Sequence, residues 1–207
     1  MKRVFYCLIL TAAASFVLSS CGDAQTTMLN QYRLHINFKD VAGNDLVASL
    51  GEEYYISESW RTKWVNEINP DKYSLDIILS DGVNATKPYY TLAKYNDDHS
   101  WLIPEVNGRY DGDGTWYLES NFVLLKKGLQ TTLTYRLSCP TIFGDDTVHE
   151  IVAWWEDGTL ISDKCRIPTC IKVVYDGMEI QPIFGISYND QSDPCYSAYF
   201  LDIVLDR

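Results

Sequence analysis

The sequence predicts an all-β protein, an antiparallel β-sandwich of the immunoglobulin-like or prealbumin-like kind. Apolar and polar residues alternate with a period of two in several segments, as expected for strands with one buried face. Dipeptides that suit tight hairpin turns separate many of these segments. No long segment has a convincing helical period, and the best helical candidate, residues 54–68, also has strand-like alternatives.

The clearest strand lies at residues 32–39. Its apolar positions Tyr32, Leu34, Ile36 and Phe38 alternate with polar ones, so we expect a buried face and a solvated face that carries His35. Residues 73–79 repeat the alternation. Further β-rich runs lie at 115–125, 133–139, 148–155, 171–175 and 195–205. In the last run both faces are apolar, which predicts a central strand covered on both sides.

The turn signals favour antiparallel pairing between neighbouring strands. Five dipeptides accept the positive φ angles of tight hairpins: Asp81-Gly82, Asn107-Gly108, Asp113-Gly114, Asp157-Gly158 and Asp176-Gly177. Since we find no internal repeat and no low-complexity linker, one β-sandwich domain over residues 31–207 is preferred. The alternative is two small β domains, about 31–127 and 128–207, because the four cysteines of the body all follow residue 138.

The N-terminus has the features of an export signal. Met1, Lys2 and Arg3 provide a positive end, and the run from Val4 to Leu18 is apolar or small. It is followed by Leu18-Ser19-Ser20-Cys21, which resembles the lipobox that bacterial lipoprotein signal peptidase cuts before its cysteine. The resemblance implies removal of residues 1–20, acylation of Cys21 and a flexible tether at residues 21–30. An uncleaved anchor is disfavoured, because the run is shorter than the about twenty apolar residues of a spanning helix.

Beyond the lipobox the chain resembles the small lipoproteins of unknown function from the cell envelope of Bacteroidetes. The residues that carry this resemblance are the opening of the β domain at 38–46, FKDVAGNDL, and the segment CPTIFGDD at 139–146. The resemblance implies an envelope location and no established activity. Gly22 follows the cysteine, which in enterobacterial lipoproteins would imply passage to the outer membrane.

The amino-acid composition limits the classes of partner that the protein can bind. Without residues 1–20 the chain has 187 residues, enough for a substantial core, and the loss of Lys2 and Arg3 changes its formal net charge from −11 to −13. Such a surface repels phosphate backbones, so we exclude nucleic acid as a partner. Anionic lipid headgroups are disfavoured for the same reason, which leaves the acyl chains as the membrane attachment.

The cysteines of the body predict disulfides. Cys139, Cys165, Cys170 and Cys195 are an even number in an oxidising compartment. Three connectivities are open. The short segment 166–169 contains Pro168 and favours a loop closed by Cys165 with Cys170, which would leave Cys139 with Cys195. A four-thiolate zinc site needs tighter pairs such as C-x-x-C, which the chain lacks.

No catalytic or metal signature is convincing, and no cofactor is predicted. The acidic residues Asp145, Asp146, Glu150, Glu156 and Asp157 are better explained as solvated hairpin ends than as an acid–base pair. The histidines His35, His99 and His149 lie in no nucleophile motif, and no G-x-S-x-G occurs. The segment Asp111-Gly112-Asp113-Gly114 resembles the start of a calcium loop, but Thr115, Trp116 and Phe122 break the pattern.

Aromatic residues offer the remaining binding signal. Trp60 and Trp64 are spaced to share one face in a helix or a strand and are candidates for an exposed binding surface, whereas Trp154 and Trp155 should point opposite ways on a strand. Asp146-Thr147-Val148 resembles the O-glycosylation acceptor sequence of Bacteroidetes, which makes Thr147 a candidate for modification. The leading hypothesis is a membrane-anchored, non-catalytic envelope lipoprotein that presents a binding face for a protein or a glycan. The alternatives are a hydrolase of envelope polymers or glycans, and a structural subunit of an envelope complex.

Overall fold

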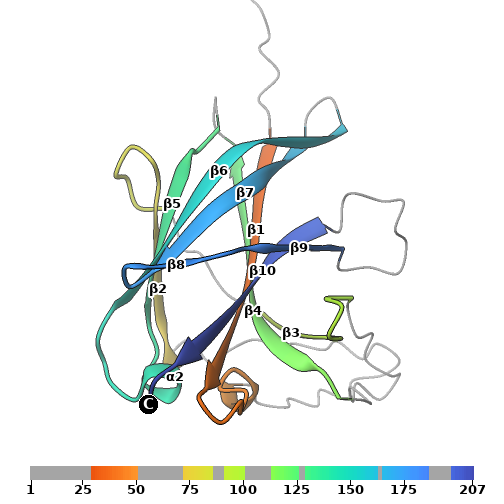
Figure 1. Cartoon of the computed structure of the whole chain (residues 1–207). Coiled ribbons are helices and arrows are strands. Elements are labelled where there is room, and N and C mark those ends of the chain that lie inside the picture. The colour runs from red at the N-terminus through yellow and green to blue at the C-terminus, as the bar shows by residue number, and fades with distance from the viewer. Residues whose placement is uncertain are drawn as a thin grey trace, which may run out of the picture.

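The computed structural model describes residues 29–50, 72–85, 91–100, 113–125, 129–162, 165–186 and 197–207 (Figure 1). These residues form strands with two short helical turns, so the all-β prediction is confirmed. The strands are β1 (Leu29–Asp40), β2 (Ser74–Ile78), β3 (Thr91–Tyr95), β4 (Thr115–Leu125), β5 (Thr132–Ser138), β6 (His149–Ser162), β7 (Cys165–Tyr175), β8 (Met178–Ile180), β9 (Ile183–Ile186) and β10 (Ser197–Leu205). The helical turns are η1 (Ala48–Leu50) and α2 (Pro140–Phe143). The helical candidate at 54–68 lies outside the described residues.

The strands join into one mixed sheet with the order β2-β5-β6-β7-β1-β10-β9. In addition, β4 pairs with β1 and β3, and β8 pairs with β7. The prediction of purely antiparallel pairing is wrong at β1, which is parallel to both β10 and β7. Hairpin turns and alternation specify local antiparallel pairs. They carry no information on a first strand that pairs with the last one.

Strand β1 holds two groups of strands together. Its first residues, Leu29 and Asn30, pair with β7, and from Leu34 onward β10 takes the place of β7 on the same side. The strands β2, β5, β6, β7 and β8 therefore diverge from the group formed by β3, β4, β10 and β9 (Figure 1). The segment 178–186 crosses between them, since β8 pairs with β7 and β9 pairs with β10.

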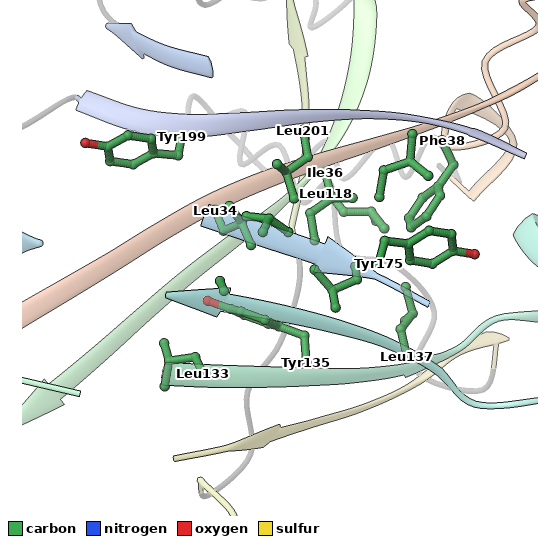
Figure 2. Packing of buried hydrophobic residues seen from close by; sticks show 14 of the residues in the cluster. Leu34, Ile36, Phe38, Leu118, Leu133, Tyr135, Leu137, Tyr175, Tyr199 and Leu201 are labelled. Atoms are coloured by element: carbon green, nitrogen blue, oxygen red, sulfur yellow. The ribbon is translucent and has the colours of Figure 1, made fainter. Parts of the chain in front are cut away.

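The main hydrophobic cluster fills the space between the two groups (Figure 2). Strand β1 contributes the four apolar residues of its predicted core face, all fully buried, which confirms the alternation there. Leu118 and Leu201 from β4 and β10 lie on the same side of the cluster, facing Leu133 and Tyr135 from β5 (Figure 2). Trp155 of β6 is 1% exposed and packs edge-on against Tyr32.

One of the predicted turns is confirmed by the structure, and another is wrong. Asp176 and Gly177 form the two-residue turn between β7 and β8, with φ angles of 42° and 86°, as predicted. Asp157-Gly158, in contrast, lies within β6, so that prediction is wrong. A Cβ atom at Gly158 would lie 1.9 Å from the carbonyl oxygen of Ile167. Glycine is therefore needed here for the close approach of β7, and not for a turn.

A second cluster covers part of the opposite face of β1. It consists of Ala93, Tyr95, Tyr117, Ala198 and Phe200. His35 is only 3% exposed and its ring lies 5.0 Å from that of Phe200, so the prediction of a solvated face at His35 is wrong. Strand β10 contributes to both clusters, which confirms the prediction of a strand covered on both sides for its first half.

Candidate functional site

The clearest exposed apolar feature is the β9 edge, which we define as Ile183 and Phe184. Strand β9 pairs with β10 from Ile183 to Ile186, and no strand within the described residues pairs with its other side. Phe184 is 57% exposed and Ile183 is 42% exposed. Among the aromatic side chains whose exposure the structure describes, Phe184 alone is exposed. An edge strand can pair with another chain, and the exposed ring of Phe184 would add an apolar contact there.

Tyr199 of β10 packs against Phe184 of the β9 edge. It is the cross-strand partner of Phe184, and the two ring centroids are 5.4 Å apart. Its hydroxyl forms hydrogen bonds with the side chain of Thr169 and the backbone of Cys170, while burial raises the pKa of the phenol. Because Tyr199 also packs edge-on against Trp155, the exposed ring of Phe184 rests on a part of the main cluster that is fixed on several sides.

The second cluster joins aromatic rings to charged groups on the outer face of the sheet. Phe200 lies at its centre, with its ring centroid 4.9 Å from Tyr95, 5.2 Å from Tyr117 and 4.6 Å from His99. The hydroxyl of Tyr95 donates to Glu119, and that of Tyr117 donates to Asp202 at 2.8 Å.

The two histidines beside this cluster face the same two carboxylates. Nδ1 of His35 lies 3.7 Å from Oε1 of Glu119, and Nε2 of His99 lies 3.9 Å from Oδ2 of Asp202. Burial, together with the negative charge of Asp202, raises the pKa of Tyr117 far above its ordinary value, so this phenol remains protonated. Each carboxylate accepts a tyrosine hydrogen bond, so the arrangement stabilises the polar groups beside the second cluster.

A third polar arrangement, the His149 network, lies where β6 begins. It consists of Asp145, Thr147, His149 and Asp176. Nδ1 of His149 is 2.6 Å from Oδ2 of Asp176, and Nε2 is 3.1 Å from Oγ1 of Thr147. The ring of Phe143 stacks on the imidazole with centroids 3.8 Å apart. The network ties the loop before β6 to the turn between β7 and β8.

The order hydroxyl, imidazole and carboxylate is also that of a nucleophile with its base. The hydroxyl of Thr147 is, however, only 2.6 Å from Oδ1 of Asp145, closer than it is to His149. Its single proton is therefore directed to the carboxylate, and this hydrogen bond helps to hold the pKa of Asp145 below its ordinary value. The geometry explains an ordered loop better than a reactive hydroxyl.

The remaining predicted acidic residues are dispersed over the surface. Glu150 pairs with Arg136 at 3.2 Å, and Asp157 pairs with Arg166. Asp146 is exposed in the loop before β6, as expected, whereas Glu156 is exposed within β6 and not at a hairpin end. Within the described ranges no three His, Cys, Asp or Glu side chains are placed to hold a metal ion, and the same ranges contain no helix long and apolar enough to cross a membrane.

No disulfide joins the three described cysteines, Cys139, Cys165 and Cys170, to one another. The predicted pairing of Cys165 with Cys170 is wrong, because both lie on β7 and the segment between them is strand and not loop. Five strand positions separate Cα atoms by roughly 16 Å, whereas a disulfide spans less than about 7 Å. Cys139 and Cys170 are buried in the main cluster, and burial raises the pKa of Cys170 to about 12. Cys195 lies outside the described residues, so its pairing with Cys139 stays a prediction.

Some of the other predicted sites lie outside the described residues, and the rest lie within them. Cys21, Trp60 and Trp64 lie outside the described residues. Thr147 is exposed, and its glycosylation stays a prediction. Trp155 is buried, whereas Trp154 is half-buried on the other face, with the Nζ atom of Lys172 5.4 Å from the centroid of its ring. The prediction that these two tryptophans point opposite ways is thus confirmed.

Comparison with known proteins adds no relative from which function could be transferred. No family model matches the chain, and none of the curated proteins or solved structures compared with it is significantly similar. Function therefore has to be argued from the surface. Sequence reasoning missed the β9 edge; the available signal was the apolar pair Ile183 and Phe184 between Pro182 and Gly185, too short for a period to be recognised.

Proposed function

We propose that the mature chain is an envelope lipoprotein, acylated at Cys21, whose β domain is a non-catalytic module that binds a protein partner. We place the binding face at the β9 edge. The observation that carries this proposal is the exposure of Phe184 on a strand that no described strand covers. The lipobox at 18–21 supports the anchor and the location at the cell envelope, with the outer membrane as the proposed membrane.

The physical basis is that an edge strand offers two kinds of contact. Its unpaired N–H and C=O groups can pair with an extended segment of a partner, which provides affinity with little dependence on sequence. Phe184 and Ile183 add apolar contacts that would select the partner. We further propose that the domain is a sandwich of the immunoglobulin-like or prealbumin-like kind, supported by the main cluster between its two groups of strands.

Two features favour a protein partner over the other hypotheses. Glu119, Asp202 and Asp145 each accept a hydrogen bond from a neighbouring hydroxyl group, which argues against the hydrolase hypothesis. For a glycan, the described tryptophans offer little open ring surface, because Trp155 is buried, Trp116 is partly buried against the main cluster and Lys172 approaches the ring of Trp154. A structural subunit of an envelope complex would use the same edge, and differs in forming a permanent, stoichiometric assembly.

The test is a crosslinked pull-down of the lipidated protein from its native host. We expect wild type to recover a defined partner and Phe184→Asp to lose it. Val83→Asp is the matched control, because Val83 is equally exposed but lies in the turn after β2. Recovery of the same partner by Phe184→Asp would overturn the assignment of the edge. Binding to a glycan array that survives in Phe184→Asp would favour a glycan at another site.

A further inference from the structure

The first residues of β1 lie beside the end of the β6–β7 hairpin, where Ser162 pairs with Cys165, and we call this pair the hairpin tip. Leu29 and Asn30 pair with Cys165 and Arg166 of β7, while Leu160 pairs with Arg166 from the other side. On its other edge β1 begins at the last residue of β4, since Leu29 pairs with Leu125. The start of β1, the end of β4 and the hairpin tip therefore lie together at the end of the domain drawn uppermost in Figure 1, which we call the proximal end.

The opposite, distal end is where β1 finishes. Asp40 pairs with Leu205 near the C-terminus, and α2 lies nearby, since Arg207 contacts the carbonyl oxygen of Thr141 (Figure 1). Exposed Val41 and Val148 lie at this end, Val41 directly after β1 and Val148 directly before β6. Strand β1 has 12 residues, so the two ends are separated by roughly 36 to 40 Å at about 3.3 Å per residue.

The length of the tether restricts how the domain can sit on a membrane. Seven residues separate Cys21 from Leu29, and even fully extended they reach at most about 28 Å. Because this is less than the length of β1, an acylated Cys21 in the bilayer cannot allow the domain to stand on its distal end. The proximal end must remain close to the lipid.

We propose that the anchored domain stands on the bilayer by its proximal end, with Leu160 at the lipid surface and the distal end directed away. This rests on the acylation of Cys21 included in the proposed function. Leu160 is 57% exposed near the hairpin tip, where an apolar side chain gains by contact with the interface.

The distribution of charge agrees with this orientation. Near the hairpin tip the ion pair of Arg166 with Asp157 neutralises one acidic residue. The distal end presents the exposed carboxylates Asp145, Asp146 and Asp176, which anionic headgroups would repel. Judged by the described residues, the proposed orientation therefore places the more acidic end farther from the membrane.

The test measures the distance of natural methyl groups from the lipid. The acylated mature protein is reconstituted into lipid nanodiscs of phosphatidylethanolamine and phosphatidylglycerol that contain a gadolinium-chelating headgroup lipid, and broadening is measured relative to the same nanodiscs without gadolinium. We expect the methyl resonances of Leu160 to broaden strongly, and those of Val41 and Val148 to remain sharp. Equal broadening of all three would mean that the domain lies on its side, and stronger broadening at Val41 and Val148 would mean that it is inverted. Either result overturns the proposal.

Controls separate this orientation from the anchor itself. Intact mass and detergent partitioning of the same sample report whether Cys21 carries fatty acid. A sample without fatty acid overturns the anchor and, with it, the basis of the orientation, whereas an acylated sample with equal broadening overturns the orientation alone. Leu160→Glu removes the methyl groups of Leu160 itself, so its effect is read from the other methyl groups near the hairpin tip, whose broadening should weaken. Val148→Glu should leave the broadening of those methyl groups unchanged.

Discussion

The two hydrophobic clusters on opposite faces of β1 bury side chains in different ways. The main cluster is mostly aliphatic and combines residues from both groups of strands. The second cluster has five members, and its two tyrosines hydrogen-bond to Glu119 and Asp202. The first depends chiefly on the apolar area removed from water, the second on the placement of a few rings and charged groups. Substitutions in each cluster can test this difference.

The largest effect should come from the main cluster. Phe38 is fully buried between Phe143 and Tyr175, with ring centroids 5.2 and 6.1 Å away. Phe38→Ala should lower the free energy of unfolding by about 3 to 5 kcal/mol, because it removes buried area and leaves a cavity. Urea unfolding followed by tryptophan fluorescence measures it. Val204→Ala, at an exposed position of β10, is the control and should stay within about 0.5 kcal/mol of wild type. A loss below that of the control would contradict the assigned core.

The second largest loss of stability should come from substitution of Gly185, which lies beneath the second cluster. A Cβ atom there would lie 2.7 Å from Cε2 of Phe200 and 2.9 Å from Cβ of His99. Gly185→Ala should therefore cost about 1 to 3 kcal/mol through overpacking, although the new methyl group is apolar. Adding Phe200→Leu should recover part of this loss, since it removes the clashing ring atoms. If Gly185→Ala were neutral in thermal and urea unfolding, the second cluster would be loosely packed and the comparison would fail.

The same contrast explains what the sequence could predict. Alternation along 32–39 identified the buried face of β1, and Asp176-Gly177 identified a hairpin, because both signals are local. The burial of His35 could not be predicted. It depends on Tyr95 and Phe200, which are distant in the sequence and arrive through pairings with β4 and β10. A polar residue on an alternating strand indicates solvent only if no other element covers that face.

The candidate site was harder still to predict, for a related reason. Strand β9 has four residues, and its role as an edge is decided by its pairing with β10 and by the crossing from β8. Residue type and spacing favour Trp60 and Trp64 for a binding surface, but neither signal reports exposure. Phe184 became visible only when exposure could be compared among all the described aromatic residues.

A smaller effect is expected from the hydroxyl of Tyr117. Tyr117→Phe keeps the ring in the second cluster and removes the hydrogen bond to Asp202. Because that carboxylate is partly exposed, we expect a loss of about 1.5 kcal/mol, near the lower limit for a hydrogen bond to a charged group. Urea unfolding at neutral pH measures the loss. An unchanged stability would mean that water replaces Asp202 without cost.

The pH dependence of this substitution has a definite sign. The pKa of Tyr117 is raised on folding, so the protonated phenol contributes stability that is fully present below the ordinary tyrosine pKa of 10.0. This contribution is lost as the pH rises from there toward the folded-state pKa. Wild type should therefore lose stability above pH 10 more steeply than Tyr117→Phe. Parallel pH profiles of the two proteins would contradict the role of burial and Asp202.

The smallest effect concerns His99, which has a φ of 63° in the turn between Asn96 and Ser100. This left-handed conformation is unfavourable for residues with a Cβ atom, and the packing of the His99 ring against Phe200 offsets the cost. Both His99→Gly and His99→Ala lose the ring, but only glycine relieves the backbone. We therefore expect His99→Gly to be the more stable of the two by about 0.5 to 1 kcal/mol in thermal unfolding, the reverse of their ranking inside helices and strands. If alanine were equal or better, the turn would not hold His99 in this conformation, and the second cluster would depend less on exact placement than the comparison requires.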